Sequence, residues 1–179
     1  FEAKTSHNSD GTYMLDVIPT FKICDEVAFT AQVFDGDKLI AEKSINVCPG
    51  KVDKITFDVL DVLEWSAEIP KLYSLILKLE KDGELCEIIR RNIGFKHIKI
   101  NKNVFYFNNK KIKLLGVNHH DTNPKTGYAM TIEDMEKDVI TFKEYNVNCV
   151  RTSHYPPDPA FIDLCDEYGV YVVDEADIE

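Results

Sequence analysis

Three clusters of polar side chains, each directly after an apolar run, hold the residue types of this 179-residue chain that are suited to chemistry. His120 and Asp121 follow the first run, and His154 follows the second. The third cluster contributes the carboxylates Asp174, Glu175, Asp177 and Glu179. Imidazoles hydrogen-bond ligand hydroxyl groups, and carboxylate oxygens are the ligands that Mg²⁺ prefers. The clusters therefore predict a site for a polar ligand and a hard cation.

Several neighbouring residues allow a structural interpretation instead. His119 fits a packed residue as well as a functional one. Ser153 beside His154 suggests a nucleophile and its base, but adjacent residues in an extended loop point apart, so we expect no such dyad. Arg151 lies in an apolar strand, where we expect it to pair with a carboxylate in the interior. For Asp177, composition favours a solvated loop.

The apolar runs are short strands separated by helical patterns. The strands are expected at residues 114–117, 147–150 and 170–173, and the helices at 132–145 and 158–168. This order is β-α-β-α-β, which is typical of a parallel sheet. Because the carboxyl ends of parallel strands meet at one edge, as in a (β/α)₈ barrel, the three polar clusters are expected to form one site.

Capping residues mark the ends of both expected helices. Thr131, with Asp134 three residues later, predicts a capping box at the first helix. Four apolar residues at helical spacing predict the face that packs on the sheet: Ile132, Met135, Val139 and Phe142. The second helix is expected to begin at Asp158-Pro159 and to end at Gly169.

Residues 1–97 follow a different pattern, in which apolar and polar residues alternate between turn signals. About seven short antiparallel strands are expected there, with aspartate-glycine turns at residues 35–37 and 81–84. This pattern predicts an immunoglobulin-like β-sandwich. Residues 98–179 begin with a hairpin at 104–114 and continue into the incomplete α/β segment. We therefore expect two domains, residues 1–97 and 98–179.

Composition excludes several classes of protein. The net charge is −10, and the one basic cluster, Lys110-Lys111-Lys113, fits a solvated hairpin edge, so we expect no nucleic-acid partner. No apolar run is long enough to span a membrane, and no signal peptide is evident. The five cysteines have no C-x-x-C spacing, which argues against zinc and disulfides and favours a cytoplasmic protein. Without an initiator Met, the chain is expected to be a piece of a longer one.

Longer motifs in both halves of the chain resemble those of one enzyme family. The motifs are Gly116-Val117-Asn118-x-His120-Asp121-x-x-Pro124-x-x-Gly127, Asn148-x-Val150-Arg151-Thr152-Ser153-His154-Tyr155-Pro156, Leu164-Cys165-Asp166-x-Tyr168-Gly169 with Asp174-Glu175-Ala176-Asp177-Ile178-Glu179, Leu63-Glu64-Trp65-Ser66-Ala67-Glu68-Ile69-Pro70 and Arg91-Asn92-Ile93-Gly94-Phe95-Lys96. In this order and spacing they resemble the β-galactosidases of glycoside hydrolase family 2.

The resemblance implies a role for each candidate site residue. Residues 1–97 would be the immunoglobulin-like domain, and residues 98–179 the first three strands and two helices of the (β/α)₈ catalytic barrel. His120 and His154 would line the galactose subsite, with Asp121 also binding substrate, and Glu179 would be a ligand of Mg²⁺ in the complete enzyme, with Na⁺ as a second candidate cation. This chain has His119 where many relatives have arginine, and Asp121 where some have glutamate.

The resemblance also implies that catalysis needs residues outside this chain. Retaining glycosidases use two carboxyl groups about 5 Å apart, and in this family both are glutamates on later barrel strands. The complete protein would be a retaining, homo-oligomeric β-galactosidase acting on lactose. The 179 residues alone would be inactive, would bind no cofactor and would need the remaining domains to cover the open barrel. The alternatives are a β-glucuronidase, a β-mannosidase or a non-catalytic immunoglobulin-like spacer.

Overall fold

The computed structural model describes residues 1–22, 25–50 and 53–177, and residue contacts divide them into two units. The first unit consists of residues 1–64 and 72–97, and the second of residues 65–71 and the chain from residue 98 onward. Neither helix in the described part of the chain is long and apolar enough to cross a membrane.

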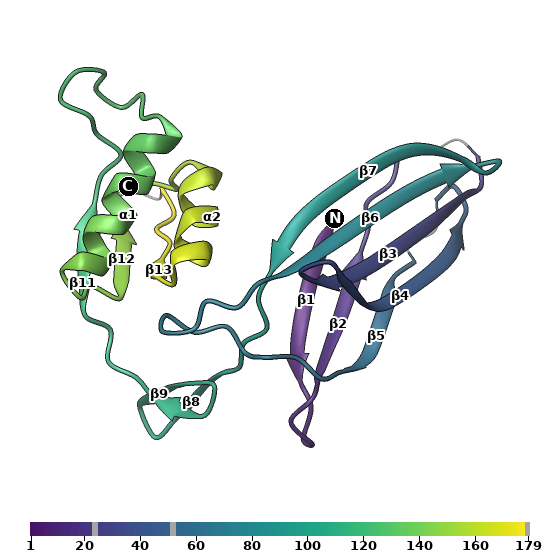
Figure 1. The fold of residues 1–179 in the computed structure, drawn as a ribbon, viewed down its shortest axis with the longest axis horizontal. Helices are drawn as coiled ribbons and strands as arrows, with labels where there is room; N and C mark the ends of the chain where they lie inside the picture. The colour runs from purple at the N-terminus through teal and green to yellow at the C-terminus, as the bar shows by residue number, and fades with distance from the viewer. Residues whose placement is uncertain (23–24, 51–52, 178–179) are drawn as a thin grey trace. The chain divides into compact units, whose positions relative to one another are not determined.

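The first unit is a sandwich of two antiparallel sheets (Figure 1). One sheet has the order β1-β2-β5, with bounds Glu2–His7, Tyr13–Ile18 and Ile55–Leu60. The other has the order β4-β3-β6-β7, with bounds Lys38–Val47, Val27–Asp35, Tyr73–Lys81 and Glu84–Ile93. Alternate residues of β2 and β3, such as Leu15 and Val33, are fully buried in one core between the sheets. The predicted alternation therefore produces two inward-facing apolar surfaces.

Tight turns join the strands of this unit where the sequence predicts them. Asp82 and Gly83 both have positive φ, 53° and 82°, and connect paired residues Lys81 and Glu84. Two consecutive positive φ values are the mark of the hairpin turn whose twist matches the flanking strands. Strand β1 was not anticipated, because most of its residues are exposed and it has no buried alternating face.

The second unit opens with a small antiparallel sheet of order β10-β9-β8. Its strands are β8 (Ile98–Asn101), β9 (Val104–Phe107) and β10 (Lys110–Lys111). Residues 108–109 form the expected turn of the β9–β10 hairpin, again with positive φ. Strand β8 is an additional strand that the sequence pattern did not indicate, since all four of its residues are exposed.

A parallel sheet with two helices follows in the same unit. The chain runs through β11 (Gly116–His119), α1 (Ile132–Glu144), β12 (Cys149–Thr152), α2 (Pro159–Tyr168) and β13 (Tyr171–Val173). The sheet order is β11-β12-β13, and both pairings are parallel. The predicted β-α-β-α-β order is therefore present, and the long connection from β11 to α1 is visible in Figure 1.

The helices form as their capping residues predict. Thr131 and Asp134 make the reciprocal capping box of α1, and Gly169 ends α2 in the left-handed conformation. Met135 and Val139 are buried in a core shared with α2 and β12. Ile132 was expected on the packed face, but it is 59% exposed. The buried face of α1 begins one turn into the helix, at Met135, which leaves its first residue largely exposed.

A seven-residue segment of the first half packs in the second unit. We expected residues 1–97 to form one domain, yet residues 65–71 group with the second unit. Trp65 is only 5% exposed, its ring packs edge-on against Phe107 and Tyr171, and its Nε1–H donates to the carbonyl of Asp166 at 2.7 Å. The segment leaves the sandwich because its one large aromatic side chain is buried in the other core.

Candidate functional site

The ends of the three parallel strands lie side by side, as the sequence suggested. In the register, Asn118 pairs with Arg151, and Arg151 pairs with Val173. Strands β11 and β12 each lie two residues later in the sequence than predicted, because polar residues such as Asn118 take part in the sheet while the first apolar residues of each run precede it. Polar residues therefore begin inside β11 and β12 and continue beyond them, whereas the carboxylates of the third cluster start directly after β13, which ends at Val173.

His120 and His154 come together at these strand ends. Their ring centroids are 5.6 Å apart and their planes are inclined by 74°. His120 Nδ1 lies 3.4 Å from the hydroxyl oxygen of Tyr155. Both histidines are exposed, so a ligand can reach their remaining nitrogens. The two residues that resemblance assigns to one subsite are neighbours in the fold.

Glu175 orients His154 from the third strand end. Its Oε1 is 3.1 Å from His154 Nδ1, and its Oε2 is 2.7 Å from Arg151 Nε. Its backbone N–H donates to Thr152 Oγ1 at 3.0 Å. Hydrogen bonding to His154, followed by pairing with Arg151, lowers the pKa of the Glu175 carboxyl. The carboxylate therefore stays charged at neutral pH and favours the tautomer that leaves His154 Nε2 for a ligand.

The sequence predicted the pairing of Arg151 but not the positioning role of Glu175. Arg151 pairs with a carboxylate, Glu175, as expected, but its side chain is 42% exposed, so the pair does not lie in the interior. Glu175 belongs to the predicted carboxylate cluster, and the structure adds its contact with His154. The parallel register would have indicated the positioning role, because Val173 pairs with Arg151 and Glu175 follows two residues later.

His119 is a packed residue rather than part of the exposed site. Its side chain is 9% exposed and stacks on Phe161, with centroids 4.7 Å apart and planes 7° from parallel. Its Nε2 is 3.0 Å from Asp138 Oδ2 on α1. Of the two interpretations that the sequence left open, the packed one describes the structure. His119 joins the end of β11 to both helices.

Asp121 lies beside His119 and is mostly buried. Its side chain is 13% exposed, and its Oδ1 is 3.5 Å from His119 Nδ1. That oxygen is buried and has no hydrogen-bond partner within the described residues. The structure therefore pairs the Asp121 side chain with the packed His119. The role of Asp121 in substrate binding remains a prediction.

Nucleophilic side chains near the site are occupied or buried. Ser153 is 1% exposed, and its hydroxyl donates to the carbonyls of His119 and Arg151 at 3.4 Å each, so no Ser153–His154 dyad exists. Burial raises the pKa of the Cys165 thiol to about 12 and also raises that of Cys149. Both cysteines are inert structural thiols, as expected.

The predicted metal ligand Glu179 lies outside the described residues. Among residues 1–22, 25–50 and 53–177, no group of three or more histidine, cysteine, aspartate or glutamate side chains is arranged to hold a metal ion. Of the other carboxylates in the third cluster, Asp174 accepts from Thr152 Oγ1 at 3.3 Å and Asp177 is exposed. The Mg²⁺ expectation therefore depends on Glu179 and on groups outside this part of the chain.

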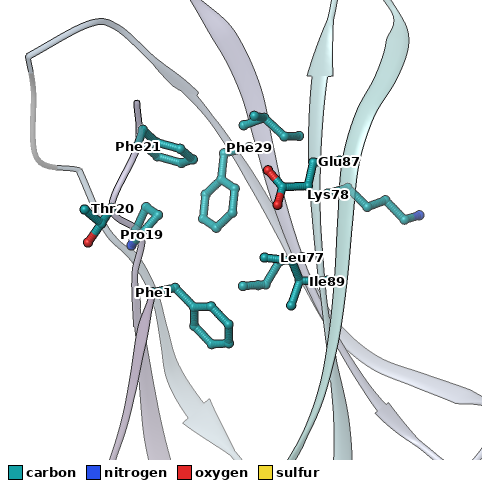
Figure 2. A pocket seen from close by; sticks show the side chains of 10 residues that line it. Phe1, Pro19, Thr20, Phe21, Phe29, Leu77, Lys78, Glu87 and Ile89 are labelled. Atoms are coloured by element: carbon teal, nitrogen blue, oxygen red, sulfur yellow. The ribbon is translucent and has the colours of Figure 1, made fainter. Parts of the chain in front are cut away.

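A cavity in the sandwich offers no competing site. Figure 2 shows its aromatic wall, with Phe1, Phe21 and Phe29 facing Leu77 and Ile89. Its volume is about 100 Å³, whereas ligand pockets measure about 300–1,000 Å³. The cavity is small and largely apolar, which suits packing rather than binding of a sugar.

Comparisons with known proteins agree with the two-part organisation of the motifs. The family model for glycosyl hydrolases family 2 matches residues 2–96, and the model for the TIM barrel domain of that family matches residues 98–179. A solved structure of Parabacteroides merdae β-glucuronidase superposes with a TM-score of 0.84 at 24% identity, over 95% of this chain and 22% of that one. At that identity the likeness concerns the fold.

Curated relatives are more similar in sequence. A β-galactosidase of Halalkalibacterium halodurans is 39% identical over 155 residues, which are 86% of this chain and 15% of that protein. The β-galactosidase BgaC of Bifidobacterium adolescentis is 33% identical over 178 residues, which are 99% of this chain and 17% of that protein. This chain spans only about one sixth of these relatives, and its resemblance to them is confirmed. The chain therefore belongs to glycoside hydrolase family 2.

Proposed function

We propose that this chain is part of a retaining β-galactosidase that hydrolyses terminal β-galactosides such as lactose. The single observation that carries the proposal is the pair of exposed histidines, His120 and His154, at adjacent strand ends. The names of the curated relatives support the choice of galactosides. Within that enzyme, residues 1–97 are an immunoglobulin-like spacer, and the parallel strands are the first three of the catalytic barrel.

The geometry supports a binding role for each histidine. With Nδ1 directed to Glu175, His154 keeps Nε2 to accept a hydrogen bond from a galactose hydroxyl. His120 Nδ1 lies 3.4 Å from the hydroxyl of Tyr155, so its Nε2 is also available to a sugar hydroxyl, as donor or acceptor. The charged Glu175 fixes the first ring, and Arg151 neutralises the second oxygen of that carboxylate. Two neighbouring imidazoles can therefore hold two hydroxyl groups of one sugar.

We further propose that Mg²⁺, or Na⁺ as a second candidate, binds in the complete enzyme with Glu179 as a ligand. An oxygen-rich strand end suits such a cation, which would supply positive charge beside the sugar. The two glutamates that cleave the bond are proposed to come from later strands of the barrel. The 179 residues alone are accordingly proposed to be inactive, with the other domains of the protein as their partners.

A panel of substrates tests the proposal. The complete protein and the 179-residue chain are each assayed with nitrophenyl β-galactoside, β-glucuronide and β-mannoside. We expect the complete protein to cleave the galactoside far faster than the other two, and the 179-residue chain to cleave none. Preference for the glucuronide or the mannoside would replace the proposed substrate. Turnover by the 179-residue chain would contradict the assignment of catalysis to later strands.

A further inference from the structure

Tyr128 exposes a large aromatic ring in the loop between β11 and α1. Its exposed fraction is 75%. The preceding loop is closed by two backbone hydrogen bonds between Asn123 and Gly127, of 2.8 and 2.9 Å, and by the Thr126 hydroxyl, which donates to the carbonyl of Ala129. The loop backbone on both sides of Tyr128 is thus hydrogen-bonded, and the ring stays accessible to a ligand.

Tyr128 is the outer member of a row of four rings. It packs edge-to-face with Tyr155, with centroids 6.4 Å apart. Tyr155 is 5.8 Å from His120, and His120 is 5.6 Å from His154. The row therefore starts at the two site histidines and leads outward to an exposed tyrosine, through residues from two loops that are distant in sequence.

The row extends beyond the two histidines, because Tyr128 joins it through Tyr155. A pyranose ring is about as wide as one step between neighbouring rings, and there are three such steps from His154 to Tyr128. A galactose held by the two histidines leaves the Tyr128 end of the row uncovered. Resting on the proposed function, we propose that Tyr128, with Tyr155 behind it, binds the aglycone of the galactoside.

The chemistry of the aglycone follows from the ring. The face of an aromatic ring carries negative electrostatic potential, which attracts the polarised C–H groups on one face of a sugar and the edge of another aromatic ring. The ligand class is therefore a β-galactoside whose leaving group is itself a sugar or an aromatic ring. A methyl group is too small to reach from the histidines to Tyr128.

Tyr145 provides a matched control. It is 77% exposed and follows the last residue of α1, and within the described residues it contacts no other aromatic ring. Both tyrosines are exposed to the same degree, so neither substitution is expected to affect folding. The only relevant difference is the neighbouring row of rings, which Tyr145 lacks.

The test compares the complete protein with its Tyr128→Ala, Tyr128→Phe and Tyr145→Ala variants, using lactose, methyl β-galactoside and inhibition by free galactose. For Tyr128→Ala, kcat/KM for lactose is expected to fall about three- to tenfold. The kcat/KM for methyl β-galactoside and the inhibition constant of galactose should stay within about twofold of their values in the unsubstituted protein. Tyr128→Phe, which keeps the ring, and Tyr145→Ala should match the unsubstituted protein throughout.

Three results would overturn the assignment. An unchanged kcat/KM for lactose in Tyr128→Ala would show that Tyr128 does not bind the aglycone. An equal loss for lactose, methyl β-galactoside and free galactose would place Tyr128 at the galactose itself. If neither the unsubstituted protein nor any variant cleaves a galactoside, the proposed function is wrong, and the aglycone assignment is wrong with it.

Discussion

Substituting Gly169 by alanine tests whether residues 65–71 pack in the second unit. Gly169 has a φ of +76°, and a Cβ added there would lie 2.5 Å from the carbonyl oxygen of Ala67. It would also lie 3.0 and 3.1 Å from two backbone carbons of the same residue. These contacts are with backbone atoms, so the clash can be relieved only if the segment moves.

The magnitude follows from three contributions. The left-handed conformation costs an alanine about 1–2 kcal/mol, and the reduced freedom of its unfolded chain offsets about 0.4–1 kcal/mol. Overpacking adds about 1–3 kcal/mol. Moving Ala67 also weakens the hydrogen bond that Lys143 Nζ donates to its carbonyl, 2.8 Å in length. We therefore expect Gly169→Ala to lower the free energy of unfolding by about 2–4 kcal/mol.

The chain contains a fluorescent probe, Trp65, and a glycine suitable for a control substitution, Gly127. Trp65, the single tryptophan of the sequence, lies in the segment, so its fluorescence during urea unfolding reports on this unit. Gly127 has a φ of +65° in the same unit, but a Cβ there would meet nothing within 4 Å. Gly127→Ala should therefore cost only about 1 kcal/mol. Equal losses in the two variants would refute the packing of Ala67 against Gly169.

Three further substitutions or measurements address the candidate site and its surroundings. The pKa of Glu175 is lowered, so the stability from its charged partners is present above the ordinary value of 4.5 and is lost as the pH falls below that value. Glu175→Gln should therefore remove this part of the acid-induced drop in melting temperature. An unchanged pH dependence in the variant would argue against a stabilising role of the Glu175 charge. His119→Phe keeps the stacked ring but loses the contact with Asp138, and should cost about 1–3 kcal/mol in chemical unfolding, whereas no loss would show the contact to be unimportant. With a thiol reagent, the exposed Cys86 should react at once and the buried Cys165 only after unfolding, and rapid reaction of Cys165 would contradict its burial.

Local signals predicted much of the fold because they act within a few residues. Thr131 with Asp134, and Gly169 after Tyr168, fix the helix ends through hydrogen bonds and φ values that the sequence states directly. The aspartate-glycine turn at residues 82–83 fixes a hairpin in the same way. Strands β1 and β8 escaped prediction because they are mostly exposed, and without a buried face there is no alternation to recognise.

Long-range contacts account for most of what the sequence left open. Trp65 packs with residues about a hundred positions later, and no local pattern indicates that partner. The role of Glu175 depends on the register of β13 against β12, which the apolar runs alone do not specify. His119 and His120 are adjacent and chemically identical, yet one is packed and the other is exposed, because His119 contacts Asp138 and Phe161 on helices that come later in the chain.

The proposed galactoside site depends most directly on His154, which would bind galactose at the end of β12. The decisive measurement is the inhibition constant of free galactose for the complete protein and for its His154→Ala variant, with nitrophenyl β-galactoside as the substrate. Losing a hydrogen bond to a sugar hydroxyl should raise that constant about tenfold. An inhibition constant that is unchanged in a folded His154→Ala variant would contradict the proposed sugar site at these strand ends.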